Sequence, residues 1–144
     1  MEREIVNKRI KLLIKNLDRL EQFTSVSIDN YLVNYDLQLI AERLFQLIVE
    51  IACDINGYLL VNLFQITPAT YFESFINMSK QGIITQELAN ELAKSAGMRN
   101  RIVHQYDEID QQVIFTAIPL AVSQYSLYIK QVNDFLNTLE VNNA

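Results

Sequence analysis

Residues 35–60 read YDLQLIAERLFQLIVEIACDINGYLL, and apolar residues fall on most sides of the helix that this segment would form. The main stripe recurs at three- and four-residue steps and three further residues widen it: Leu37, Ile40, Leu44, Leu47, Ile48, Ile51 and Ile55, with Phe45, Val49 and Ala52. A helix this apolar is buried on several sides. The segment therefore predicts a helix that lies either at the centre of a bundle or partly in a subunit interface.

Helical periodicity continues on both sides of this segment. An amphipathic first helix, ending near Phe23, is predicted from Val6, Ile10, Leu13, Leu17 and Leu20, and the polar residues 24–30 predict a connection. After a break at Thr67-Pro68, residues that can cap a helix precede three further apolar repeats: Thr70, Thr85 and Asp110. Gly82 should end the first of these helices, and Pro119 should kink or split the last.

The composition agrees with one all-α domain over residues 1–144, an antiparallel bundle of about five helices. Three Gly and two Pro are too few for the many turns of an all-β fold. Half of the residues are apolar, which is enough for a core without metal or disulfide cross-links. The single cysteine, Cys53, is interpreted as a core residue rather than a reactive thiol, and it suits a reducing cytoplasm.

The sequence indicates a soluble, cytoplasmic protein without a membrane span. Its charged start, Met1-Glu2-Arg3-Glu4, lacks the apolar block of a signal peptide. The uncharged stretches 55–72 and 111–129 contain Asn or Gln and a Pro, and we interpret both as too polar for a lipid-facing helix. The net charge of −5 argues against non-specific binding to nucleic acid, so an RNA substrate would need a local basic patch. Such a patch is offered by Lys94, Arg99, Arg101 and His104.

Arg99 interrupts the apolar face of the helix that Thr85 begins. On an ideal helix Arg99 lies about 20° from Leu88, and Tyr106 lies directly in line with Leu88. Removing one partner of a buried charge pair costs about 3–5 kcal/mol, so Arg99 needs a partner. In a structural interpretation, Arg99 pairs with Asp54 or Glu50 and Tyr106 is a core tyrosine. In a functional interpretation, Arg99 binds an anionic ligand.

His104 is the only histidine of the chain, and it points about 140° away from Arg99 on an ideal helix. The two side chains would not meet at one phosphate if the helix ran straight and acted alone. Either the helix ends near His104, as the polar pair Asp107-Glu108 suggests, or a second copy of the chain supplies the missing group. Two-fold pairing would bring two copies of each side chain into one cleft, and we therefore expect a symmetric homodimer. An Arg99 locked to a carboxylate deep in one bundle, with His104 away from any cleft, would argue against this interpretation.

The segment RNRIVHQY, residues 99–106, resembles the signature of the HEPN family, an Arg, four residues, a His, one residue and a Tyr. The likeness is greatest to the HepT toxin branch. It extends to residues 41–46 and 52–55, and to 71–75 followed by Gly82-Ile83, so it covers nearly the whole chain in the right order.

The resemblance implies a five-helix bundle, a symmetric dimer and metal-independent cleavage of RNA in a toxin–antitoxin pair. It implies that Arg99 and His104 are the catalytic pair and that Asn100 is a supporting polar group. From the basic patch we expect Arg101 and Lys94 to contact RNA. Tyr106 would be the regulatory tyrosine, to which a minimal nucleotidyltransferase antitoxin of the MntA type attaches AMP.

These residue types suit that chemistry, because RNA carries its own nucleophile, the 2′-hydroxyl. A histidine can move the proton and an arginine can stabilise the charge on the phosphorus oxygens. We expect no metal and no cofactor, because one histidine cannot build a zinc site and no glycine-rich phosphate loop is present. The alternative is a non-catalytic helical dimer that binds a minimal nucleotidyltransferase and serves as its substrate.

Overall fold

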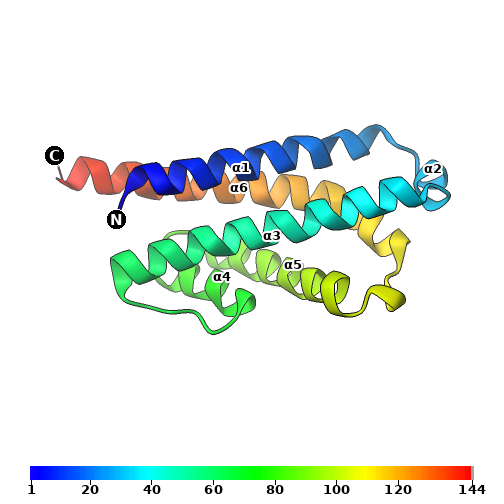
Figure 1. Ribbon diagram of the computed structural model, residues 1–144. Coiled ribbons are helices and arrows are strands. Elements are labelled where there is room, and N and C mark those ends of the chain that lie inside the picture. The colour runs from blue at the N-terminus through cyan, green and yellow to red at the C-terminus, as the bar shows by residue number, and fades with distance from the viewer. Residues whose placement is uncertain (144) are drawn as a thin grey trace.

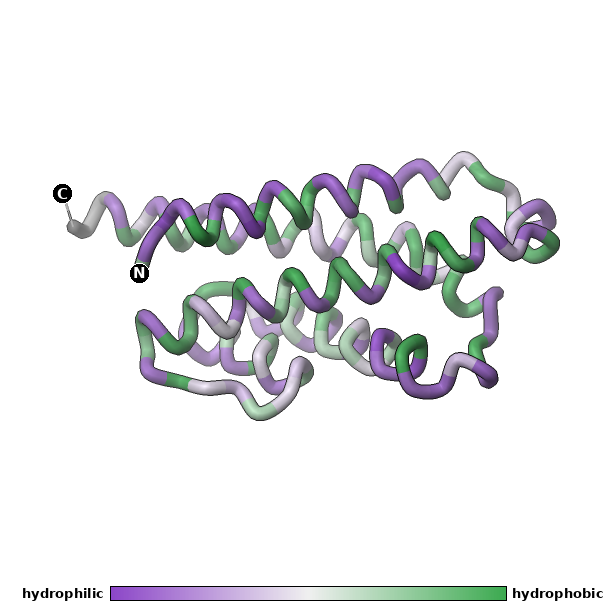
Figure 2. The backbone as a smooth tube through the Cα atoms, viewed as in Figure 1, coloured by the Kyte–Doolittle hydropathy of each residue, from purple (hydrophilic) through white to green (hydrophobic). Residues whose placement is uncertain are grey.

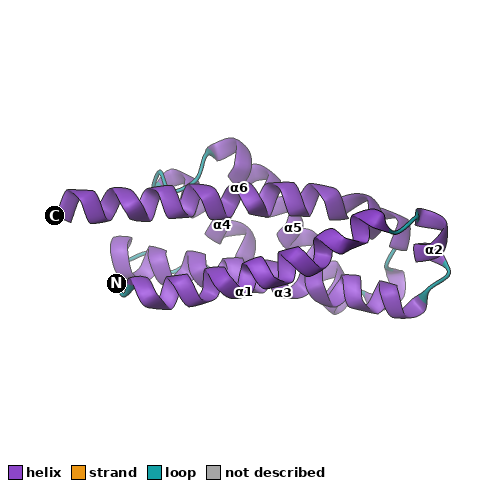
Figure 3. Cartoon of the chain, turned by 90° about the horizontal axis from the view of Figure 1, so that it is seen from above, coloured by secondary structure: helices purple, strands orange, loops and turns teal. Residues whose placement is uncertain are grey.

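The computed structural model describes the backbone of residues 1–143 and the side chains of residues 1–140, and every regular element in that range is a helix (Figures 1 and 3). The elements are α1 (Arg3–Glu21), η1 (Gln22–Ser25), α2 (Ile28–Leu32), α3 (Tyr35–Phe64), α4 (Tyr71–Lys80), α5 (Gln86–His104), η2 (Tyr106–Glu108) and α6 (Gln111–Asn143). The long helices α1, α3, α5 and α6 run alternately in opposite directions (Figure 1). The predicted all-α antiparallel bundle is confirmed.

Helix α3 is the centre of the bundle. It contacts α1, α2, α4, α5 and α6, and its apolar stripe forms the middle of one continuous core. Figure 2 shows the difference from α1, along which hydrophilic residues predominate and hydrophobic ones recur at intervals. A helix with apolar residues on most sides can bury them only by packing against several neighbours, so α3 takes the central position.

The segment predicted as a connection after the first helix contains the short helix α2. Ser27 begins it by accepting a hydrogen bond from the N–H of Asn30 at 3.2 Å. Tyr31 is fully buried, and its hydroxyl donates to Gln111 at 2.8 Å. The described chain thus has six α-helices rather than about five, because a cap and one buried aromatic residue suffice for a turn too short to show periodicity.

The three predicted helix caps are confirmed. Each side chain accepts a hydrogen bond from a backbone N–H in the first turn of its helix: Thr70 from Glu73, Thr85 from Leu88 and Asp110 from Gln112. Gly82, with φ +75°, follows α4 in the left-handed conformation that glycine tolerates best. Helix α6 continues past the exposed Pro119, so of the predicted kink or split the split does not occur.

A buried polar network joins α3, α4 and α6. The hydroxyl of Tyr128 donates to Asn56, and the amide of Asn56 donates to Ser74 at 3.0 Å. Cys53 lies beside this network, and burial raises the pKa of its thiol to about 12. Its interpretation as a core residue is confirmed.

Helices α3 and α6 are both long and apolar enough to cross a membrane by length and composition alone. The Gln and Pro residues in 111–129 therefore do not by themselves exclude a span. Of the most apolar stretch of each helix, 61% is buried inside the bundle in α3 but only 28% in α6. α3 is a core helix, whereas α6 leaves apolar side chains uncovered, among them Val113, Leu120 and Leu127.

Candidate active site

The end of α5 sets the relative directions of the predicted site residues. The helix is regular to His104, and Gln105 leaves helical geometry with φ −128° and ψ 43°. Tyr106 then lies in η2, off the line that a longer helix would have given it. The helix ends at His104, as in one of the two alternatives that the sequence left open, so Arg99 and His104 lie on regular helix while Tyr106 does not.

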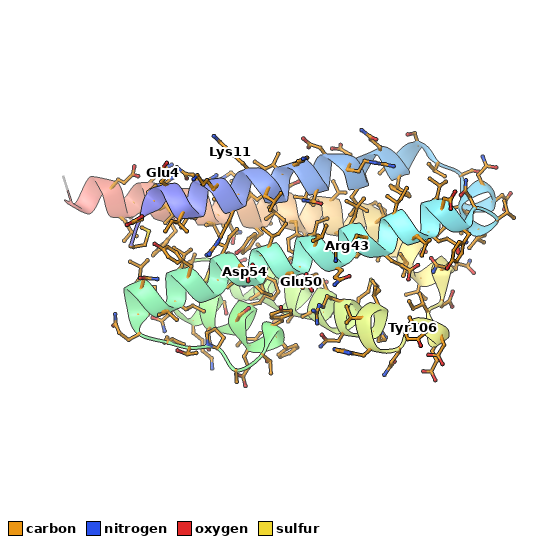
Figure 4. The ribbon with its side chains drawn as sticks, viewed as in Figure 1. Glu4, Lys11, Arg43, Glu50, Asp54 and Tyr106 are labelled. Atoms are coloured by element: carbon orange, nitrogen blue, oxygen red, sulfur yellow. The ribbon has the colours of Figure 1, made fainter. Side chains whose placement is uncertain are left out.

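Arg99 forms an ion pair with Glu50 of α3. Its Nη2 donates to the Glu50 carboxylate at 2.6 Å, and the two side chains are 15% and 25% exposed. The structural interpretation named Asp54 or Glu50 as partner, and Glu50 is the one used. The pair lies at the bundle surface between α3 and α5 rather than deep in the core, and Figure 4 shows Glu50 on the side of α3 that faces the α4–α5 layer.

The guanidinium of Arg99 keeps a second edge for other groups. Its Nη1 donates to the exposed amide oxygen of Asn100 at 3.1 Å. Its Nε is buried and has no hydrogen-bond partner among the described residues. One edge is therefore tied to Glu50, while the Nη1 edge points toward a polar group at the surface.

The electrostatics of Glu50 agree with a firm ion pair. Burial by itself would raise the pKa of its carboxyl group. The hydrogen bonds from Arg99 and Gln46 and the charges of Arg99 and Arg43 outweigh burial and hold that pKa below its usual value. Glu50 is thus anionic at neutral pH and fixes the position of the Arg99 cation.

His104 does not approach Arg99 within one chain. It is exposed, and its direction from the axis of α5 differs from that of Arg99 by about 140°. The best-formed cavities in the described part of the chain have none of Arg99, His104 and Tyr106 in their walls. A single copy therefore does not bring the predicted catalytic pair together.

The other predicted RNA contacts lie on the solvent face of α5. Lys94 and Arg101 are both exposed, seven residues apart and about 20° from each other around the helix, with His104 about 60° from Arg101. Lys94 also pairs with Glu91 at 3.0 Å. The predicted basic patch is divided, because Arg99 faces α3 instead of joining these residues.

Tyr106 is 78% exposed and lies at the end of the bundle where α5 stops (Figure 4). The alternative of a core tyrosine is wrong, because that alternative assumed a helix that continues to residue 106. The core tyrosines are instead Tyr31, Tyr125 and Tyr128. The phenol of Tyr106 is accessible to a second protein.

Sequence reasoning missed one contact of Arg99. The ring of Tyr71, the first residue of α4, lies with its centroid 4.9 Å from the Arg99 guanidinium carbon. Nothing in the local sequence signals this contact, because it depends on how the 65–70 connection returns the chain to the side of α5.

The HepT-like family profile, described as "Ribonuclease HepT-like", matches residues 13–132. The chain belongs to this family. It is 46% identical over 143 residues to the "tRNA nuclease HepT" of Aphanizomenon flos-aquae, covering 99% of this chain and 97% of that protein. It is 24% identical over 127 residues to the "mRNA nuclease HepT" of Shewanella oneidensis, covering 87% of this chain and 92% of that protein.

The HepT-like fold is also found among solved structures. A tri-AMPylated HEPN toxin of Shewanella oneidensis, in complex with an MNT antitoxin, superposes with a TM-score of 0.84 at 21% identity. The match covers 93% of this chain and 99% of that one. The cytosolic Bacillus subtilis protein YutE, of unknown function, has a TM-score of 0.82 at 18% identity, covering 96% of this chain and 92% of that one.

Within the described residues of this HepT-like chain, no group of three or more His, Cys, Asp or Glu side chains is arranged to hold a metal ion. The polar groups gathered around Arg99 are instead Glu50, Asn100 and Tyr71. This set can hold a guanidinium in place and offer one edge of it to an anion.

Proposed function

We propose that the chain is a metal-independent endoribonuclease toxin that cleaves RNA, with tRNA as the favoured substrate class. The observation that carries the proposal is a half-buried, oriented Arg99 on the same helix as an exposed His104, in a HepT-like chain. The 46% identity to a protein named as a tRNA nuclease supports the choice of substrate.

In this mechanism the 2′-hydroxyl of the RNA attacks the adjacent phosphorus. His104 takes the hydroxyl proton or protonates the leaving 5′-oxygen, either of which contributes about 10²–10⁴-fold. Arg99 stabilises the charge that develops on the phosphorus oxygens. The bond from phosphorus to the 5′-oxygen breaks, and the products are a 2′,3′-cyclic phosphate and a 5′-hydroxyl end.

The ion pair with Glu50 is compatible with a phosphate ligand. Glu50 contacts Nη2, and the Nη1 edge beside Asn100 is the one a phosphate oxygen would meet. Arginine donates from several nitrogens at once, so it can keep one carboxylate and bind one anion. Asn100 would then be the supporting polar group that the phosphate displaces or shares.

The active form in this proposal is a symmetric dimer with composite sites, each using Arg99 of one copy and His104 of the other. The divergence of these side chains on α5 requires a second source for one of them. The apolar side chains of α6 that the bundle leaves uncovered support an association of this kind, because exposed apolar surface favours burial.

Regulation in this proposal is the attachment of AMP to Tyr106 by a nucleotidyltransferase antitoxin of the MntA type in the cytoplasm. The exposed phenol can reach the active site of another protein. An AMP group adds negative charge and bulk next to the cleavage site, so it repels and blocks the substrate phosphate.

The cleavage experiment compares the wild-type protein with His104→Ala on tRNA, messenger RNA and single-stranded DNA in the presence of EDTA. We expect cleavage of tRNA with a cyclic phosphate end, no cleavage of DNA, and loss of cleavage in H104A by at least about 10²-fold. Because the His104 side chain is exposed, the helical circular dichroism of the H104A protein should match that of the wild type. A fully active H104A would refute the catalytic assignment.

The composite site is tested by mixing two inactive variants, Arg99→Ala and His104→Ala. If each site draws on both copies, half of the randomly assembled dimers carry one intact site, and activity returns to about a quarter of the wild-type value. If the mixture stays inactive although the subunits exchange, each site takes Arg99 and His104 from the same subunit.

A second function, a non-catalytic dimer that is only a nucleotidyltransferase substrate, is favoured by the Arg99–Glu50 pair, which a purely structural arginine would also form. Intact RNA at micromolar wild-type protein, with AMP still transferred to it, would select this alternative. Tyr106→Phe should abolish AMP transfer while leaving RNA cleavage unchanged.

A further inference from the structure

Tyr71 covers one face of the Arg99 guanidinium, with 4.9 Å between the ring centroid and the guanidinium carbon. Glu50 and Asn100 contact nitrogen atoms at its edges, so they restrain it mainly within its own plane. A cation above an aromatic face is attracted to the ring, most strongly where water is excluded. With the Arg99 side chain only 15% exposed, the Tyr71 ring lies where it can limit tilting of the guanidinium plane.

The position of Tyr71 is itself fixed by the fold. It is the first residue of α4, where Thr70 accepts the N–H of Glu73 at 3.0 Å and Glu73 accepts the N–H of Ala69 at 3.2 Å. The carbonyl of Tyr71 accepts the hydroxyl of Ser74 at 2.8 Å.

Ser74 in turn belongs to the buried Asn56–Tyr128 network, so the first turn of α4 is tied to both α3 and α6. The ring therefore approaches Arg99 from a rigid support. Burial also raises the pKa of the Tyr71 phenol, although the Arg99 charge acts in the opposite direction, so the ring stays neutral at physiological pH.

We propose that Tyr71 is a positioning residue for the ribonuclease reaction: its ring holds the Arg99 guanidinium in the plane in which the Nη1 edge meets the scissile phosphate. This inference rests on the proposed function, because it assigns Tyr71 a part in the same site. Tyr71 acts through Arg99 and does not contact the reacting atoms. The ring is required, and its hydroxyl is not.

The kinetic test compares Tyr71→Leu with the ring-retaining Tyr71→Phe and with Phe72→Leu, the same kind of change at an exposed neighbour. We expect kcat of Y71L to fall about tenfold with KM within about twofold, because orientation of a charge-stabilising group matters most in the transition state. Y71F should stay within about twofold of the wild type, which would be rescue by the conservative variant. F72L should behave as the wild type.

A spectroscopic test reports on the contact itself. The ring current of residue 71 should shift the Nε–H resonance of Arg99 in nitrogen–proton spectra. The shift should persist in Y71F and disappear in Y71L, with the rest of the amide spectrum of Y71L retained.

The outcomes separate this inference from the proposed function. An Arg99→Ala variant that is inactive beside a fully active Y71L would overturn the role of Tyr71 and leave the nuclease standing. Equal losses in Y71L and Y71F would also overturn it, because the hydroxyl and not the ring would then matter. A fully active R99A would overturn the nuclease site and this inference together.

Discussion

The two halves of α5 follow different rules although they form one continuous helix. In residues 86–96 the apolar positions are all buried in the core: Leu88, Ala89, Leu92, Ala93 and Ala96. In residues 97–104 only Ile102 is buried. Two positions lie about 20° from Leu92 in direction, and they hold Arg99 and the partly buried Val103. The first half packs into the core. The second half instead carries Arg99, which forms an ion pair, and the exposed His104.

This difference explains why the candidate site lies where it does. The first half is buried in the core and α5 packs against α4, α3 and α6, which fixes the axis of the helix. The second half then projects Arg99 toward α3 and His104 toward solvent from that fixed axis. Substitutions in the first half should therefore change mainly stability, whereas substitutions around the second half should change the ion pair or RNA binding.

The largest effect on stability is expected from the packing half. Leu92→Ala removes a fully buried side chain and should lower the free energy of unfolding by about 2–5 kcal/mol. Urea denaturation followed by circular dichroism measures this loss. RNA cleavage per folded molecule should remain close to the wild type, and Asn90→Ala, exposed on the same helix, should change stability by less than about 0.5 kcal/mol. A Leu92→Ala protein of normal stability would contradict the assignment of this half to the core.

A smaller, pH-dependent effect is expected from the ion pair. Glu50→Gln should lower stability at pH 7 by about 1 kcal/mol, because a partly exposed pair contributes less than a buried one. The pKa of Glu50 is depressed in the folded state, so its contribution is complete above the usual value of 4.5 and is lost as the pH falls through the folded value.

Denaturation curves of both proteins between pH 7 and pH 3 should therefore converge below pH 4.5, the usual value for this carboxyl group. Asp54→Asn, exposed on the same helix, provides the control. A difference that persists unchanged to pH 3 would show that the charge of Glu50 is not what stabilises the pair.

The smallest effect is expected at the solvent face of α5. Arg101→Ala should leave stability within about 0.5 kcal/mol, since the side chain is exposed. If Arg101 contacts a phosphate, RNA binding should weaken several-fold and the slope of log K against log salt should fall by about 0.7 to 0.9. Fluorescence anisotropy at several salt concentrations measures this slope, with Lys8→Ala on α1 as control. An unchanged slope would remove Arg101 from the RNA contacts.

The sequence predicted the fold well wherever side chains repeat regularly. The stripe of residues 35–60 predicted a helix at the bundle centre or partly in a subunit interface, and the capping residues placed the starts of α4, α5 and α6. It failed at α2, where a single turn depends on the burial of Tyr31. Of the kink or split expected at Pro119, the split does not occur.

For the candidate site, the sequence predicted that Arg99 needs a partner, and it offered a helix end near His104 as one of two alternatives. It left open Asp54 or Glu50 as the partner, since both lie on the same side of α3 and only the register between helices selects one. It gave two alternatives for Tyr106, and the helix end removed the buried one. It gave no sign of the Tyr71 contact, because α4 and α5 meet through a connection without a regular pattern.

The sequence by itself determined the all-α class, the identity of the central helix and the one helix that carries the unusual pairing of arginine and histidine. These depend on periodicity and capping, which act between residues only a few positions apart. Only the tertiary structure decided that Glu50 and Tyr71 hold Arg99 and that Arg99 and His104 diverge. Such contacts join residues far apart in sequence, and their geometry follows from how whole helices pack.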